Sequence, residues 1–141
     1  MKRILIINSS YYKQISKKLV LGVKKVLSTK KFNTSILDVP GIYEIPIAIR
    51  KNINKFDGFI ALGCVIKGQT PHFDLITYST FNSIQNLSIK YNKPIGNGII
   101  TAFNINQAKI RSDITSKKKP NKGSEATNAV ISILNNGPKK I

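Results

Sequence analysis

The feature that most constrains this chain is a short run near its start, RILIIN at residues 3–8, which is apolar, β-branched and does not alternate with polar residues. A strand with one face in water alternates between apolar and polar residues, so a continuous run is typical of a strand buried on both faces. Further strands are expected at residues 33–39, 58–66 and 94–101, of which GFIALGCVI at 58–66 is the most apolar. Such a sheet needs helices on both faces.

Stripes of residues at helical spacing lie between these strands. The three longest stripes are Ile15, Leu19, Val23, Val26 and Leu27; Phe73, Ile76, Thr80, Ile84 and Leu87; and Ala126, Ala129, Val130, Ile133 and Leu134. A short helix is expected at residues 43–51 with Pro46 in its first turn, where proline is tolerated. Another is expected to begin after Asn104, which with Gln107 resembles a capping box, and to run through Arg111.

Strands that alternate with helices predict an α/β fold with a parallel sheet covered on both faces. Right-handed crossovers then restrict the topology to a flavodoxin-like, three-layer α/β/α sandwich with a four-stranded parallel sheet. No repeat or linker divides the 141 residues, so we expect a single domain at residues 1–141. The lysine-rich stretch at 116–122 is expected to be a surface loop within it.

The charge balance leaves two interpretations open. With 23 Lys and Arg against 6 Asp and Glu, the net charge of +17 favours an anionic partner, or it reflects lysine usage that only solvates the surface. No basic stretch is interleaved with aromatic residues as in a single-strand binder. No apolar run is long enough for a membrane span, and no cleavage-like site follows the first apolar run. A lone Cys64 agrees with a reducing, cytoplasmic location.

Ligands of such folds bind outside the carboxyl ends of the strands, so the strand-to-helix corners are the places to search. The corner after residue 66 joins a buried strand to a helix start, where free N–H groups and the helix dipole favour an anion. There Gly68 permits close approach or positive φ, Gln69 follows it, and Thr70 offers a hydroxyl. His72 is the only histidine, and an imidazole exchanges protons near neutral pH. The alternative is that Gly68 and Thr70 only form the turn and that His72 is surface decoration.

Other corners offer weaker candidates. Glu44 could accept hydrogen bonds from a heterocycle, or it could simply favour a helix dipole. Tyr11 and Tyr43 could stack on a ring, or they could be ordinary packing residues. Arg111 and Lys122 flank the basic loop and could grip phosphate or remain solvated. A Walker loop, a dinucleotide-binding glycine motif and a zinc-ligand set are all absent from the sequence.

Four stretches together resemble the lumazine synthase family: VPGIYEIP at 39–46, ALGCVIKGQTPHFD at 61–74, PIGNGIITAFNINQAKIR at 94–111, and NKGSE at 121–125. The resemblance implies condensation of 5-amino-6-ribitylaminouracil with 3,4-dihydroxy-2-butanone 4-phosphate, without metal or cofactor. It implies a homopentamer, or a multiple of pentamers, with active sites between subunits, no nucleic-acid or membrane partner, and riboflavin synthase as the downstream enzyme.

The resemblance also assigns roles to individual residues. His72 matches the proton-transfer histidine. The residues that match the pyrimidine and ribityl site are Tyr11, Ile42, Tyr43, Glu44, Cys64, Val65, Ile66 and Asn97. Those that match the phosphate site are Gln69, Thr70, Arg111 and Lys122.

Two positions and one spacing depart from the family pattern. Asn97 stands where many members have a phenylalanine, and Ile110 where an acidic residue commonly precedes the arginine. The spacing from Arg111 to Lys122 is longer than in capsid-forming members, which favours a free pentamer. Two other function classes remain open: a flavin- or lumazine-binding module without catalysis, and a nucleic-acid binder, which would show steep salt dependence.

Overall fold

The computed structural model describes residues 1–141 and contains one parallel sheet with the strand order β2-β1-β3-β4. Its strands are β1 (Arg3–Ser9), β2 (Asn33–Val39), β3 (Gly58–Ile66) and β4 (Ile95–Ala102). All four strands predicted from the sequence are present, and the order places β1 and β3 in the middle. Central parallel strands need cover on both faces, which explains their continuous apolar runs.

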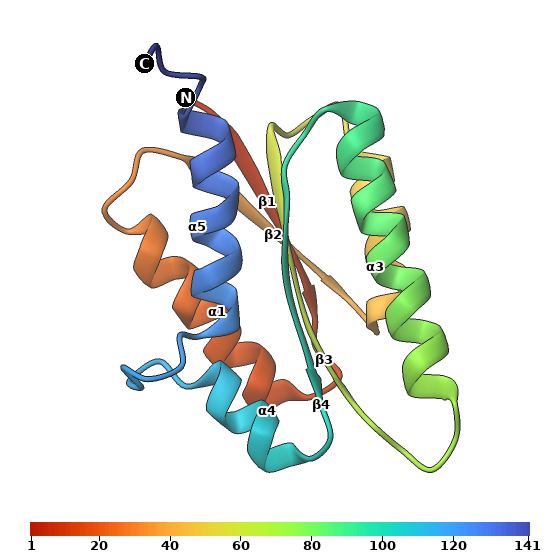
Figure 1. Ribbon diagram of the computed structural model, residues 1–141. Helices are drawn as coiled ribbons and strands as arrows, with labels where there is room; N and C mark the ends of the chain where they lie inside the picture. The colour runs from red at the N-terminus through yellow and green to blue at the C-terminus, as the bar shows by residue number, and fades with distance from the viewer.

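Helices cover both faces of this sheet (Figure 1). The helices are α1 (Lys13–Leu27), α2 (Ile45–Asn52), α3 (His72–Tyr91), α4 (Ile105–Ser112) and α5 (Lys122–Asn135), with a short 3-10 helix η1 (Ile42–Glu44) before α2. Helices α1, α4 and α5 form one layer, and α2 and α3 form the other. The arrangement confirms the predicted three-layer, flavodoxin-like sandwich. None of the helices combines the length and hydrophobicity that crossing a membrane requires.

The side chains of β1 are divided between two cores. Ile4 and Ile6 pack in the core beneath α1 and α5, whereas Leu5 and Ile7 pack in the core beneath α2 and α3. This alternation of direction follows from the pleat of a strand, and all four residues are buried because both faces are covered. The continuous apolar run is therefore a two-sided core strand, as the sequence predicts.

Strand β2 contrasts with β1. It lies at the edge of the sheet, and every residue except Val39 is exposed. The Ile36 side chain retains 50% of its surface, although its Cα lies opposite that of the buried Ile6. One neighbouring strand and partial helix cover leave β2 as the least protected part of the sheet.

Some predicted boundaries need correction. The helix expected at residues 43–51 is divided, because η1 comes first and α2 begins at Ile45, with Pro46 in its first turn as predicted. Lys122 is not part of the basic loop but the first residue of α5. The predicted cap at Asn104 is confirmed, because its side chain accepts a hydrogen bond from Gln107 N. The reciprocal bond of a capping box is shifted by one residue, because Gln107 Oε1 accepts from Phe103 N and not from Asn104 N.

Candidate active site

A pocket of about 240 Å³ lies at the carboxyl edge of the sheet, where the corners after β1, β2 and β3 meet the start of α3. Four of the ten residues that line the pocket are at the ends of strands, and six are in the segments that follow them. The predicted site residues that line it are Tyr11, Ile42, Cys64, Val65, Ile66 and His72. Residues far apart in sequence thus meet at the place where ligands of parallel α/β sheets bind.

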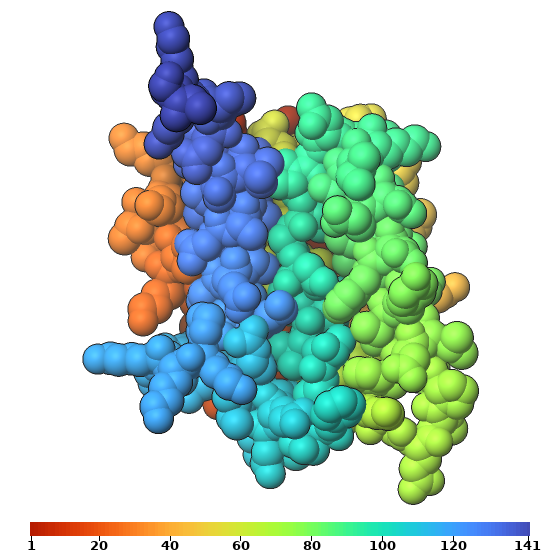
Figure 2. All heavy atoms as spheres, viewed as in Figure 1, coloured from red at the N-terminus to blue at the C-terminus, as the bar shows by residue number.

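Larger hollows lie elsewhere on the surface, and none of them contains the histidine. One of about 430 Å³ lies at the amino edge of the sheet, between the ends of α3, β4 and α5, and β4 is visible there between α5 and α3 in Figure 2. Its one ionisable group is Lys93, whose Nζ already donates to the carbonyl groups of Ile53 and, at 2.8 Å, Phe56. That lysine closes the turn before β3 and has a structural role. The carboxyl-edge pocket, which contains the histidine, is the better candidate.

The corner from β3 to α3 positions His72. Lys67 N donates to Ala102 O at 2.9 Å, which extends the β3–β4 ladder one step beyond Ile66. The chain then turns through exposed residues, and α3 begins at His72, whose N–H donates to Thr70 Oγ1 at 3.4 Å. His72 is therefore placed by a helix start, with its side chain at the pocket wall.

Two expectations for this corner have different outcomes. Gly68 has no positive φ, so that part of the prediction is not realised, while the open space around it, where a Cβ would meet nothing within 4 Å, leaves the close approach of a ligand as a prediction. Gln69 and Thr70 are exposed and lie just outside the pocket lining, beside the start of α3. They are placed where the free N–H groups of the first helical turn can share an anion.

The corner after β1 supplies two aromatic residues. Tyr11 is exposed over the pocket mouth and packs edge-on against Tyr12, with ring centroids 5.0 Å apart. Tyr12 also lines the pocket but was not among the predicted site residues. Its place next to Tyr11, directly before a helical stripe, was the signal that could have revealed it. Burial, with smaller contributions from Cys64 and Tyr11, raises the pKa of the Tyr12 phenol.

Burial also raises the pKa of the Cys64 thiol to about 11. A thiol is nucleophilic as the thiolate, so Cys64 is inert at neutral pH and forms wall rather than reactive group. Tyr12 likewise stays protonated. Among the side chains that line the pocket, His72 carries the one imidazole, the side chain that enzymes use most often as a general acid or base.

The wall after β2 depends on a close approach. A Cβ added to Gly63 would lie 2.7 Å from Ile42 Cγ2, so the glycine lets η1 pack directly on β3. Tyr43 points outward, and Glu44 is half-buried with an Oε2 atom that has no hydrogen-bond partner. Both line a neighbouring hollow against α3, not the pocket itself. The unpaired carboxylate oxygen is an acceptor that a polar ligand could satisfy.

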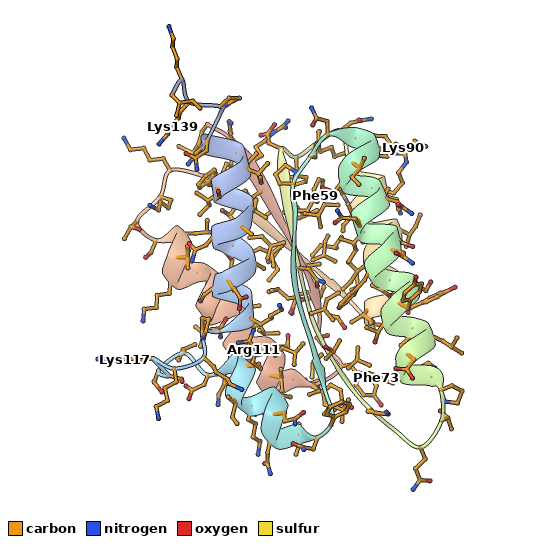
Figure 3. All side chains as sticks on the ribbon, in the orientation of Figure 1. Phe59, Phe73, Lys90, Arg111, Lys117 and Lys139 are labelled. Carbon is orange, nitrogen blue, oxygen red and sulfur yellow. The ribbon has the colours of Figure 1, made fainter.

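The remaining predicted residues are not brought to this pocket within the chain. Asn97 is half-buried on β4, where its Oδ1 accepts a hydrogen bond from Ile99 N at 3.1 Å. Arg111, at the end of α4, donates to Pro120 O at 3.1 Å and forms an ion pair with Glu125 Oε2 at 2.9 Å. Figure 3 shows Arg111 and Phe73, the neighbour of His72, on opposite sides of the sheet.

The fold and the pocket define a class: α/β proteins with a parallel sheet that form a ligand pocket at its carboxyl edge, here with a histidine at the start of a helix. A sequence model of the 6,7-dimethyl-8-ribityllumazine synthase family matches residues 1–137. The chain belongs to this family.

Individual relatives agree. The chain is 38% identical over 139 residues to the 6,7-dimethyl-8-ribityllumazine synthase of Campylobacter curvus, which covers 95% of this chain and 87% of the relative. It is 40% identical over 138 residues to that of Campylobacter jejuni subsp. doylei, covering 94% and 88%. It is 34% identical over 139 residues to that of Methylorubrum populi, covering 94% and 80%.

Proposed function

We propose that this protein is a cofactor-independent enzyme that condenses 5-amino-6-(D-ribitylamino)uracil with 3,4-dihydroxy-2-butanone 4-phosphate to 6,7-dimethyl-8-ribityllumazine, releasing phosphate, in riboflavin biosynthesis. The observation that carries the proposal is the position of His72, which begins α3 and lines the carboxyl-edge pocket of a chain in the lumazine synthase family. Each step of the reaction moves protons, and His72 is the proton carrier that the pocket offers.

The proposed chemistry balances in four steps. The 5-amino group adds to the ketone carbonyl, and loss of one water leaves an imine. A proton is then removed from carbon, phosphate leaves, and the second ring closes with loss of another water. His72 takes and returns the protons. Holding both substrates together supplies much of the remaining acceleration, because the condensation joins two molecules.

The ring side of the site is assigned to residues from three corners. Cys64, Val65 and Ile66 face the pyrimidine through their backbone at the end of β3, and Tyr11 stacks on it. Ile42, Tyr43 and Glu44 cup the ribityl chain. The unpartnered, buried Glu44 Oε2 supports this assignment, since a polyol hydroxyl would satisfy it.

The phosphate side is assigned to Gln69, Thr70, Arg111 and Lys122. Because Arg111 lies across the sheet from the histidine corner, we propose that a neighbouring copy supplies Arg111 and Lys122, and Asn97 as well. The site is then complete only in an oligomer. Expelling phosphate needs its charge stabilised, which the N–H groups of α3 and these cations would do.

The surface of α3 supports such an oligomer. Leu75, Tyr78 and Ile89 lie along its outer side and remain 68%, 74% and 70% exposed. Large exposed apolar patches mark interaction surfaces. We propose a homopentamer, kept from forming a shell by the long basic loop. Light scattering that reports a particle of capsid size would contradict the second part of this proposal.

The same proposal places the protein in the cytoplasm, with riboflavin synthase acting next on its product and with no nucleic-acid or membrane partner. The free thiol of Cys64 suits a reducing compartment. If the +17 charge served nucleic-acid binding instead, a DNA or RNA fragment would bind tightly at physiological salt, with an affinity that falls steeply as salt rises.

An absorbance assay tests the activity. Purified protein is mixed with both substrates, and formation of the lumazine chromophore is followed together with release of phosphate. We expect both products at equal rates, and neither when one substrate is omitted. Binding of a lumazine analogue without any turnover would favour the alternative, a non-catalytic lumazine- or flavin-binding module.

A further inference from the structure

The long basic loop between α4 and α5 is closed at its base by one buried side chain. Asn121, directly before α5, is only 5% exposed. Its Nδ2 donates to Ser112 O at 2.8 Å and to Lys18 O at 3.1 Å, and its Oδ1 accepts from Ser124 N at 3.0 Å. A single amide therefore joins the end of α4, the middle of α1 and the first turn of α5.

The two ends of the loop are also joined one step earlier. Arg111 donates to Pro120 O at 3.1 Å, and the next residue, Ser112, accepts from Asn121 at 2.8 Å. We call the hydrogen bonds of the Asn121 side chain the clamp. Arg111 immediately precedes Ser112, which the clamp holds, and Lys122 immediately follows Asn121. The relative position of the two cations assigned to the phosphate is thus fixed by hydrogen bonds of Pro120 and Asn121, and not by a contact between the cations.

Helix α1 provides the support for the clamp. A Cβ added to Gly22 would collide with Asn121 Oδ1 and lie 2.8 Å from Ser124 Oγ, while Ser124 Oγ donates to Gly22 O at 3.1 Å. The glycine leaves the space that the asparagine fills. Because α1 packs in the core through Leu19 and Val23, the hydrogen bond from Asn121 to Lys18 O attaches the clamp to the core of the molecule.

Residues 114–119, the middle of the loop, contribute nothing to this arrangement. The hydrogen bonds of residues 114–119 stay within the loop: Thr115 N and Oγ1 both donate to Asp113 Oδ1 at 2.8 Å, and Lys119 N donates to Ser116 Oγ at 3.4 Å. The lysines at 117–119 are exposed. Figure 3 shows Lys117 directed away from the body of the molecule.

From this geometry we infer that Asn121 is a positioning residue for the phosphate half of the site, and that the loop beyond it is dispensable for phosphate binding. The inference rests on the proposed function, because it takes Arg111 and Lys122 as the phosphate-binding pair. It states that the spacing of these cations is set by the three hydrogen bonds of one amide and not by the length of the chain between them.

Replacing Asn121 by serine separates two roles of its side chain: the donor bonds to Ser112 O and Lys18 O, and the cap of α5. In Asn121→Ser the hydroxyl still caps α5, but the donors to Ser112 O and Lys18 O are lost. We expect the KM for the phosphorylated ketone to rise about tenfold, because misplaced cations lose charge-assisted hydrogen bonds, while kcat and the KM for the pyrimidine stay within about twofold. A matched control is Asn104→Ser, which alters the exposed asparagine cap of α4 and is expected to leave both KM values unchanged.

A loop deletion gives the second arm. Removing residues 116–118 takes out two exposed lysines and leaves the clamp intact. We expect the KM for the ketone to remain within about twofold at physiological salt, where distant exposed charges are screened. If Asn121→Ser does not fold, this deletion decides: a tenfold rise in KM for the ketone would overturn the inference, and an unchanged KM would support it.

The outcomes distinguish the two proposals. If the wild-type protein forms no lumazine, the proposed function fails, whatever the variants do. If the wild-type protein is active but Asn121→Ser raises both KM values equally, or neither, Asn121 is a structural cap only and the positioning inference fails.

Discussion

The two halves of the candidate site are built in different ways. The ring half is a pocket inside one chain, whose walls are strand ends and a short helix packed on them, with Gly63 and Ile42 in direct contact. The phosphate half is a pair of cations on the other layer, held by hydrogen bonds around Asn121 and by the ion pair from Arg111 to Glu125. Apolar packing fixes the first half, and polar contacts fix the second.

This difference shows what one subunit can do alone. Packing shapes a cavity within a single core, so the pocket of the ring half forms when the chain folds, although the proposed contact of Asn97 comes from a neighbouring copy. Cations cannot be buried unpaired, so they are kept near the surface and can be offered to a second molecule. A site divided in this way should respond to mutation in two separable patterns, one in turnover or ring binding and one in the use of the phosphorylated substrate.

The largest effect is expected for His72→Ala, within the ring half. Removing the proton carrier should lower kcat by about 100-fold, with little change in either KM, because proton transfer is a task of the transition state. Steady-state kinetics with both substrates measure it. An unchanged kcat would remove His72 from the proposed role.

Arg111→Ala tests the phosphate half. Loss of a charge-assisted contact is expected to raise the KM for the ketone phosphate by about 30-fold, equivalent to roughly 2 kcal/mol, and to leave the KM for the pyrimidine unchanged. Lys117→Ala is the matched control, because it removes a cation from the exposed loop. Equal losses for both substrates would show that the halves are not separable.

Cys64 offers a chemical measure of how well the ring half is closed. Burial raises the pKa of its thiol from 9.0 to about 11, so the folded state favours the protonated form. The corresponding stability is fully present below pH 9 and is lost as the pH rises toward 11. At pH 8 we expect iodoacetamide to label Cys64 in the folded protein about tenfold more slowly than in the unfolded chain, because the thiolate fraction is about 100-fold smaller while the more basic thiolate is about tenfold more nucleophilic. Equal rates, followed by mass spectrometry, would mean that the pocket is open to solvent.

The smallest effect is a difference in stability between alanine variants of two glycines, Gly63 and Gly68. Gly63→Ala places a Cβ 2.7 Å from Ile42 Cγ2 and is expected to lower the free energy of unfolding by about 1 kcal/mol through overpacking. Gly68→Ala meets no atom within 4 Å and has no positive φ, so it should be neutral or slightly stabilising. Denaturant titrations of the two variants compare them. A Gly63→Ala variant as stable as the wild type would show that η1 can move away without cost.

The fold was largely predictable because its signals are local. A continuous aliphatic run such as residues 4–7 and a stripe such as Ile15, Leu19 and Val23 each indicate an element and the face it buries. Small errors arose where neighbours decide the conformation. The break between η1 and α2 and the ordinary φ of Gly68 depend on packing and hydrogen bonds that no local pattern contains.

Part of the candidate site could be located from the sequence, but its geometry could not. The pattern around His72 predicted a histidine at a helix start, and the structure has His72 as the first residue of α3 and at the pocket wall, while its role in proton transfer stays a prediction. The separation of Arg111 from that corner follows from the layer to which α4 belongs, and the polar contacts of Asn121 reach Lys18, 103 residues away. Tyr12 was missed because an aromatic residue before a helix is usually packing.

Local opening of the exposed edge strand β2 should control how often the pocket opens. β2 is paired on one side only, and its end leads within a few residues into the Gly41 to Glu44 wall, while β3 on the other side of the pocket is buried along most of its length. Poorly covered strands open locally far more often than core strands. The amide protons of β2 should therefore exchange with deuterium before those of β3. The wall that follows β2 should open at the same rate as β2. Access to the ring half would then depend on how often the edge strand β2 opens, while β3 at the floor of the pocket remains closed.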